Sequence, residues 1–145
     1  MDPLLSQLAD LCSRARTEAK WVIVPSYMVG NMMGERLARF CSVAAATLDV
    51  ARVSIWLFND AHSELRCVHL FDRLKNVRES GAVLQVGRYP HYFESLEQRR
   101  TIAAVDATTD PSTSEFTSGY LDSFGISSML DVPIRREGRT VGVLC

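Results

Sequence analysis

The spacing of the apolar residues changes once along the chain, and this change constrains the fold more than any other feature. From about Met28 to Leu48 the apolar residues recur with the period of an amphipathic helix, whereas Arg52–Phe58 is rich in the β-branched and aromatic residues of strands. We expect strands at residues 52–58, 64–71, 82–86, 101–106, 127–134 and 140–145. Because short turns join several consecutive strands, the pattern predicts an α+β fold. We expect an antiparallel central sheet of about five to six strands with helices on its faces.

Two further helices are predicted between the later strands. Pro90 suits the first turn of a helix that runs to about Arg99. In the second helix, Ser112 and Glu115 have the spacing of a capping box, and Gly125 is well placed to end the helix. These helices are expected to lie on the sheet.

The N-terminal segment carries a narrow apolar stripe on one side of a predicted helix. The stripe consists of Leu4, Leu8, Leu11 and Ala15. Such a helix either lies on the core of its own domain or pairs with the same helix of a second subunit, and the pattern is too short to decide. Pro25 ends this segment. We therefore expect residues 1–25 to form a linker and a helix that could dimerise, and residues 26–145 to form the main domain.

Composition and charge exclude several classes of function. The 145 residues include 16 basic and 17 acidic side chains without a basic stripe, which argues against nucleic acid as a partner. No apolar run approaches the roughly 20 residues of a membrane span, and the N-terminus does not read as a signal peptide. The four cysteines (Cys12, Cys41, Cys67 and Cys145) have no metal-binding spacing. They are typical of reduced cysteines in a cytoplasmic protein.

Several motifs in a fixed order resemble a known family. They are the Tyr-Pro pair before a short helix, Asp106 after a strand, the "TDP" loop, "YLDSFGISSMLDVPI" and the closing "VGVLC", together with "ARVSIWLFND" earlier in the chain. From about Val43 to Cys145 the chain resembles a GAF domain, the small-molecule sensory module of signalling proteins. It is more similar to the GAF domains of bacterial histidine kinases and diguanylate cyclases than to those of phytochromes. The resemblance implies a GAF/PAS-like fold.

The resemblance also implies what surrounds this domain. In GAF domains the final strand leads into a long C-terminal helix and often into an output domain, whereas this sequence stops at Cys145. We therefore expect a domain truncated before that helix, either naturally or at a chosen boundary, with an output domain beyond Cys145 in a longer protein. An uncovered apolar strip of sheet favours association. Together with the N-terminal stripe, it predicts a homodimer.

Catalysis and covalent chromophore binding are not expected. The family includes free methionine sulfoxide reductases, which use cysteines on the loops around the pocket, but the corresponding stretches Asp72–Gly81 and Ala107–Ser114 contain none. The helix at Ser114–Phe124 lacks the cysteine-histidine pair that attaches bilins in related proteins. His91 is the best-placed residue for haem, and a weak candidate. We expect no enzymatic activity and no metal site, and the sequence does not identify a cofactor.

The candidate ligand site combines polar residues suggested by the resemblance with nearby aromatic residues. Relatives that bind cyclic nucleotides use a serine in the first strand, a Phe-Asp pair and an aspartate with threonines at similar places. These aspartates could instead start turns, and the aromatic rings could fill the core solidly. The candidate ligand-binding residues are Ser54, Trp56, Phe58, Phe71, Asp72, Tyr92, Asp106, Thr108, Phe116 and Tyr120.

The sequence therefore predicts a non-catalytic regulatory module of a signal-transduction protein. The module senses a small molecule or dimerises, as in two-component sensors or cyclic-dinucleotide enzymes. The alternatives are a ligand-free dimerisation scaffold and a redox enzyme similar to the free methionine sulfoxide reductases.

Overall fold

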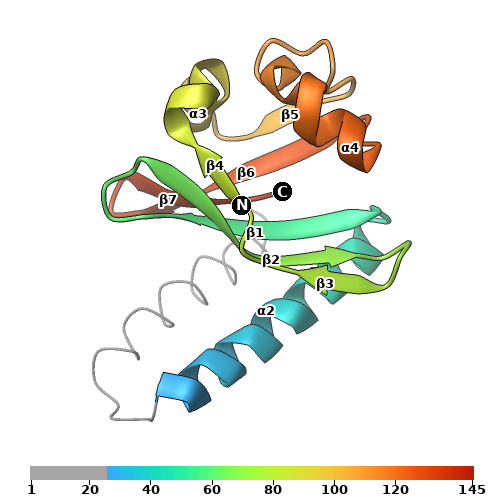
Figure 1. Ribbon diagram of the computed structural model, residues 1–145, viewed down its shortest axis with the longest axis vertical. Coiled ribbons are helices and arrows are strands. Elements are labelled where there is room, and N and C mark those ends of the chain that lie inside the picture. The colour runs from blue at the N-terminus through green and yellow to red at the C-terminus, as the bar shows by residue number, and fades with distance from the viewer. Residues whose placement is uncertain (1–25) are drawn as a thin grey trace.

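The computed structural model describes residues 26–145, and it is shown in Figure 1. The helix predicted within residues 1–25, with its two alternative ways of packing, lies outside the described residues. The elements in chain order are α2 (Ser26–Thr47), β1 (Arg52–Phe58), β2 (Glu64–Asp72), β3 (Val77–Glu79), β4 (Val83–Gln85), α3 (Pro90–Gln98), β5 (Ile102–Ala104), α4 (Asp122–Phe124), β6 (Met129–Arg136) and β7 (Arg139–Leu144). Short 3₁₀ and π turns at Val86–Arg88, Ser114–Phe116 and Thr117–Leu121 complete the described segment.

The seven strands form a sheet in the order β3-β2-β1-β7-β6-β5, in which every pair is antiparallel. Strand β4 also pairs with β2. This arrangement confirms the predicted α+β fold with an antiparallel central sheet. The prediction of five to six strands was one strand short because it missed β3, a three-residue segment whose side chains are all exposed.

Strands β3 and β4 act as one interrupted edge strand. They pair with opposite ends of β2, and backbone hydrogen bonds of 2.8 Å join Cys67 to Gly81 and Ala82 between them. Gly81 has a φ of 94°, which a residue with a side chain rarely adopts. The glycine therefore permits the kink that divides the edge strand in two.

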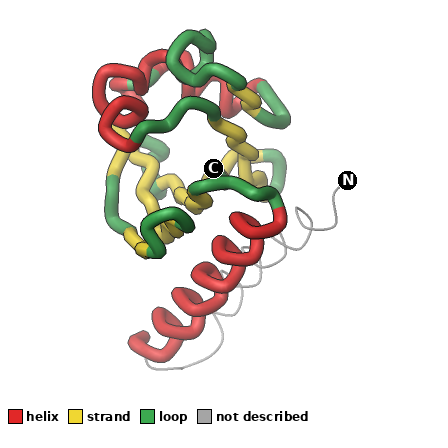
Figure 2. The backbone as a smooth tube through the Cα atoms, turned by 90° about the vertical axis from the view of Figure 1, so that its right-hand side faces the viewer, coloured by secondary structure: helices red, strands yellow, loops and turns green. Residues whose placement is uncertain are grey.

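Helix α2 covers one face of the sheet, and Figures 1 and 2 show it crossing below β1 and β2. Cys41 and Ala45 of α2 are completely buried, and they pack with Val53 and Ile55 of β1 and with Phe71 of β2. The small side chains on this side of α2 let the helix approach the strands closely. Apolar burial of this kind stabilises the fold by about 25 cal/mol for each Å² removed from water.

The opposite face of the sheet carries a second core beneath α3 and the segment of residues 107–128. Tyr92, Phe93 and Leu96 of α3 are buried there, and they pack in one cluster with Trp56 of β1 and Leu65 of β2. Helix α3 matches the predicted helix closely, with Pro90 in its first turn. Strand β1 therefore separates two cores, since its alternate residues point to opposite faces.

The helix predicted to follow Ser112 is wrong as a continuous element. Glu115 does not complete a capping box, because its carboxylate accepts hydrogen bonds from the backbone N–H of Tyr92 at 3.0 Å and from the ring of His91 at 2.8 Å. The chain then leaves helical geometry at Ser118 and Gly119. Only the predicted end is confirmed: Gly125 lies in the left-handed region with a φ of 62° after the short α4.

Candidate functional site

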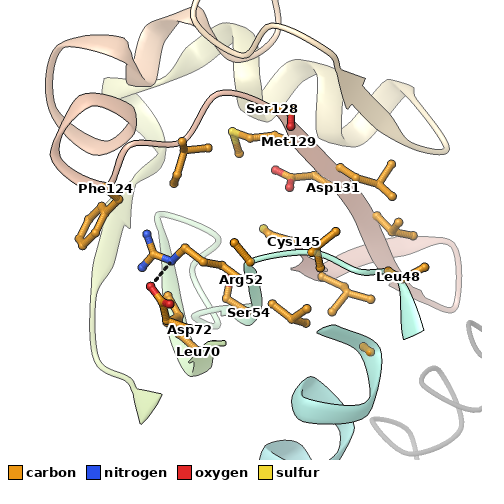
Figure 3. A pocket seen from close by; sticks show the side chains of 18 of the residues that line it. Leu48, Arg52, Ser54, Leu70, Asp72, Phe124, Ser128, Met129, Asp131 and Cys145 are labelled. Carbon is orange, nitrogen blue, oxygen red and sulfur yellow. Dashed lines mark ion pairs between the residues drawn. The ribbon is translucent and has the colours of Figure 1, made fainter. Parts of the chain in front are cut away.

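A cavity of about 910 Å³ lies between the sheet and the segment that connects β5 to β6 (Figure 3). Its walls come from the end of α2, from β1, β2, α3 and β6, and from the segment of residues 116–128. This volume lies within the range of known small-molecule pockets, which are mostly apolar with a few placed polar groups.

Aromatic rings form one wall of the cavity. Tyr92 and Phe116 meet edge to face with 4.6 Å between their ring centroids, and Trp56 meets Tyr120 with 6.3 Å between centroids. Trp56, Tyr92 and Phe116 are buried. The aromatic residues therefore leave a cavity rather than filling this part of the core.

Strands β1 and β7 provide a polar floor. The Trp56 indole Nε1–H donates a hydrogen bond of 2.9 Å to Ser54 Oγ, which fixes the indole against β1. Ser54 of β1 and Cys145, which directly follows β7, exchange two backbone hydrogen bonds of 2.9 Å, and both residues line the cavity (Figure 3).

Asp131 of β6 lies on the facing wall and is completely buried. Its Oδ2 accepts a hydrogen bond of 2.7 Å from the Tyr92 hydroxyl, whereas its Oδ1 has no hydrogen-bond partner among the described residues. Burial raises the pKa of Asp131 to about 6, although the Tyr92 hydroxyl and the neighbouring Cys145 thiol oppose the rise. Burial and the Asp131 carboxylate also raise the pKa of Tyr92 well above its ordinary value. We call these two residues the Asp131–Tyr92 pair.

A charged pair lies at the other side of the cavity. Arg52 Nε lies 3.6 Å from Asp72 Oδ2, and the Arg52 guanidinium lies 4.4 Å from the centroid of the Phe124 ring. Asp72 is buried, and its Oδ1 also accepts a hydrogen bond of 3.0 Å from the backbone N–H of Lys75. The Arg52–Asp72 pair therefore places a fixed cation opposite Asp131 (Figure 3).

The structure brings six of the ten sequence-predicted site residues together around the cavity. They are Ser54, Trp56, Asp72, Tyr92, Phe116 and Tyr120. Ser54 and Asp72 also form the local hydrogen bonds that the sequence left open as an alternative to ligand binding.

The other four predicted residues lie elsewhere. Phe71 packs on the α2 side of the sheet, because a bulge in the pairing of β1 with β2 shifts which residues of β2 face the cavity. Phe58 packs against His62 and Phe93 at the far end of β1. Asp106 is exposed, and it accepts hydrogen bonds from the backbone and hydroxyl of Thr108, so these two residues stabilise a turn.

The expected haem candidate also lies away from the cavity. His91 is exposed and its ring binds Glu115 on the outer side of α3. Within residues 26–145 no cluster of three or more His, Cys, Asp and Glu side chains could hold a metal ion.

Sequence reasoning missed Arg52, Phe124, Asp131 and Cys145 as site residues. Asp131 offered a signal, since it is a single charged residue within the apolar run "MLDVPI" and strand alternation gives it a fixed face. Arg52 and Phe124 offered none, because only the folded chain brings them together.

The two buried cysteines of residues 26–145, Cys41 and Cys67, do not have the chemistry of reactive thiols. Burial raises the pKa of Cys41 to about 12 and that of Cys67 to about 11. Nucleophilic cysteines act as thiolates, which need a lowered pKa. These two thiols therefore serve in packing at neutral pH.

The chain is similar to several solved structures. The chain is similar to the GAF domain of a two-component sensor histidine kinase from Bacillus halodurans, with 26% identity, a TM-score of 0.46, and coverage of 64% of this chain and 60% of that chain. It is similar to the free methionine-R-sulfoxide reductase from Neisseria meningitidis in complex with its substrate, with 19% identity, a TM-score of 0.57, and coverage of 77% and 59%. It is also similar to the phycocyanobilin-bound GAF domain from a cyanobacterial phytochrome, with 16% identity, a TM-score of 0.62, and coverage of 93% and 76%.

The first two of these similarities span less than two thirds of the other protein's chain. The comparison with curated proteins gave no match. No helix of the described segment is long and apolar enough to cross a membrane.

The family model of the GAF domain matches residues 33–145, which include all seven strands and the whole cavity. The chain belongs to the GAF domain family.

Proposed function

We propose that this GAF domain is the small-molecule-sensing module of a cytoplasmic signal-transduction protein of the two-component or cyclic-dinucleotide type. The observation that carries the proposal is the cavity of about 910 Å³, which combines aromatic walls with the buried Asp131 carboxylate. Pockets of this composition bind small ligands and use their few polar groups to orient them. The phytochrome GAF domain of similar fold is bilin-bound, which supports a ligand role for this fold.

Strand β1 offers a physical route from the cavity to α2. Ser54 and Trp56 line the cavity, Ile55 packs in the core beneath α2, and Val53 belongs to that core and also borders the cavity. A ligand that displaces Trp56 therefore shifts the strand against which α2 packs. Such a displacement regulates an output domain only if the ligand binds one arrangement of the helix more tightly than the other.

We propose that the module itself is non-catalytic. The raised pKa values of Cys41 and Cys67 support this, because a reductase of this fold would need a reactive thiolate. The chain is 19% identical in sequence to the Neisseria meningitidis reductase. A similarity at this level reflects a shared fold rather than a shared reaction.

Native mass spectrometry of gently purified protein tests the sensing proposal. We expect an additional mass that disappears when the protein is denatured, since only the folded chain brings the residues of the cavity together. Binding of a released or added ligand would also change the fluorescence of Trp56, measured in a Trp21→Phe variant so that Trp56 is the only tryptophan. A protein that carries no added mass and shows no fluorescence response across a broad metabolite panel would contradict the proposal.

A second candidate function is dimerisation without a ligand. Exposed apolar side chains favour it: Val43 of α2, the following Leu48, and Leu130 of β6 are each more than half exposed. We propose that residues 1–25 take part in this contact through their stripe of leucines. A ligand-free scaffold would keep its dimer while failing the mass-spectrometry test, so the two functions are separable.

A further inference from the structure

The Asp131 carboxylate is incompletely satisfied in a buried place. Tyr92 supplies one hydrogen bond to Oδ2, and Oδ1 has none within the described part of the chain. The Cys145 thiol also donates to this carboxylate, but a thiol is a weak hydrogen-bond donor and does not replace an N–H or O–H group. Buried polar groups almost always have a partner, so an orphaned carboxylate oxygen at a cavity wall points to a missing donor.

No basic side chain of the described residues serves as that donor. The ion pairs of residues 26–145 include none to Asp131, and the cation across the cavity, Arg52, is already paired with Asp72. The charges of Arg52 and Asp72 cancel. Asp49, the other carboxylate of the lining, is paired with Arg73, so Asp131 is the lining carboxylate without a basic partner within residues 26–145.

The rest of the wall fits a cationic ligand with a flat apolar body. Trp56 and Tyr120 line the same cavity as Asp131, and aromatic rings attract cations in addition to packing against apolar groups. Met129 lies beside Asp131 in Figure 3, and its unbranched side chain adapts readily to a ligand.

We propose that the cavity binds a small molecule with a protonated amine or amidine on a flat apolar body, and that Asp131 Oδ1 accepts its N–H group. This inference rests on the proposed sensing function, and it names the ligand class. The carboxylate, held in place by Tyr92, selects cations, while the aromatic wall selects the apolar body.

Matched pairs of probes test the inference by isothermal titration calorimetry. The amines and amidine are tryptamine, phenethylamine and benzamidine, and their acidic counterparts are indole-3-propionate, 3-phenylpropionate and benzoate. We expect at least one cation to bind and its acidic counterpart to bind at least tenfold more weakly. In Asp131→Asn the affinity for that cation should fall at least tenfold.

Asp106→Asn is the matched control, because it removes a carboxylate that is exposed and lies outside the cavity. It should bind the same cation as the wild type does. In Asp131→Asn the new amide oxygen can still accept the Tyr92 hydrogen bond, and a thermal melt checks that the variant is folded.

Three results would overturn the inference: acids that bind better than cations, a cation whose affinity is unchanged in Asp131→Asn, or no cation bound at millimolar concentration. Binding of an acid, or an added mass that is not a cation, would leave the sensing function standing and reject only the ligand class. Failure of all six probes, together with no added mass and no fluorescence response across the broad metabolite panel, would reject both.

Discussion

At the scale of single residues, Asp131 makes the stability of this domain depend on pH. Its pKa is about 6 in the folded state and 3.8 in its ordinary environment, so the folded state binds the proton more tightly. The contribution of Asp131 to the free energy of unfolding is therefore complete below pH 3.8, and it is lost as the pH rises through about 6. At about 1.4 kcal/mol for each pKa unit, the loss is on the order of 3 kcal/mol.

We therefore predict a pH-dependent effect of Asp131→Asn in the absence of ligand. The variant cannot ionise, so its free energy of unfolding relative to the wild type should rise by up to about 3 kcal/mol between about pH 4 and pH 7.5. Urea unfolding at the two pH values measures this difference. A difference that does not change with pH would mean that Asp131 keeps an ordinary pKa in the folded protein.

The sequence allowed part of the site to be predicted at this scale. Ser54, Trp56 and Phe58 were identified together because alternate residues of a strand share a face. Only Ser54 and Trp56 line the cavity, since Phe58 packs against His62 and Phe93 at the far end of β1. Phe71 was misplaced because the bulge opposite Ile55 and Trp56 has no local signal in the sequence. Asp106 was misplaced because an aspartate after a strand serves equally well to start a turn.

At the scale of elements, β7 approaches β1 so closely that only glycine fits at position 142. A Cβ added to Gly142 would overlap the backbone carbonyl of Trp56 and lie 2.8 Å from Cδ2 of Leu57. We predict that Gly142→Ala lowers the free energy of unfolding by about 1–3 kcal/mol, the usual effect of overpacking. Urea denaturation provides the measurement.

Gly87→Ala is the control for this prediction, since a Cβ there meets nothing within 4 Å. It should change stability far less than Gly142→Ala. Equal stability of the two variants would show that β7 moves away from β1 without difficulty, and the close approach would then have no energetic importance.

The elements themselves were predicted where the apolar pattern is strong. Strand β1 has the predicted bounds, because its seven residues alternate between two buried faces. Strand β3 was missed because its pairing with β2 depends on the backbone and leaves its side chains exposed. The helix after Ser112 was predicted as continuous because the interaction of Glu115 with His91 and Tyr92 of α3 joins residues far apart in sequence.

At the scale of the whole molecule, the stripe Leu4–Ala15 leads to a prediction about assembly. We expect the chain to be a dimer in sedimentation velocity experiments, and Leu8→Glu to shift it toward monomers by at least tenfold in the dissociation constant, since a charge would then interrupt the leucine contact. Gln7→Glu adds the same charge beside the stripe and should leave the dimer intact. A monomeric wild type, or equal behaviour of the two variants, would exclude this interface.

The overall architecture was the most predictable level of description. Its α+β class and antiparallel pairing follow from the change in apolar period and the short turns, and they agree with the match to the GAF domain family. The cavity was not predictable in the same way. Whether aromatic residues enclose a space or fill it depends on packing between α3, β6 and the connecting segment, and no single stretch of sequence records that packing.

The unsatisfied oxygen of Asp131 also has a consequence for the lifetime of the protein in a cell. A chain without a partner for this carboxylate is less stable than it would otherwise be, so it opens more often and is exposed to proteases more often. Any molecule that satisfies the carboxylate slows that turnover by mass action. The abundance of the protein would then rise and fall with the supply of its ligand, so the same atom would control both how the domain responds and how much of the domain there is.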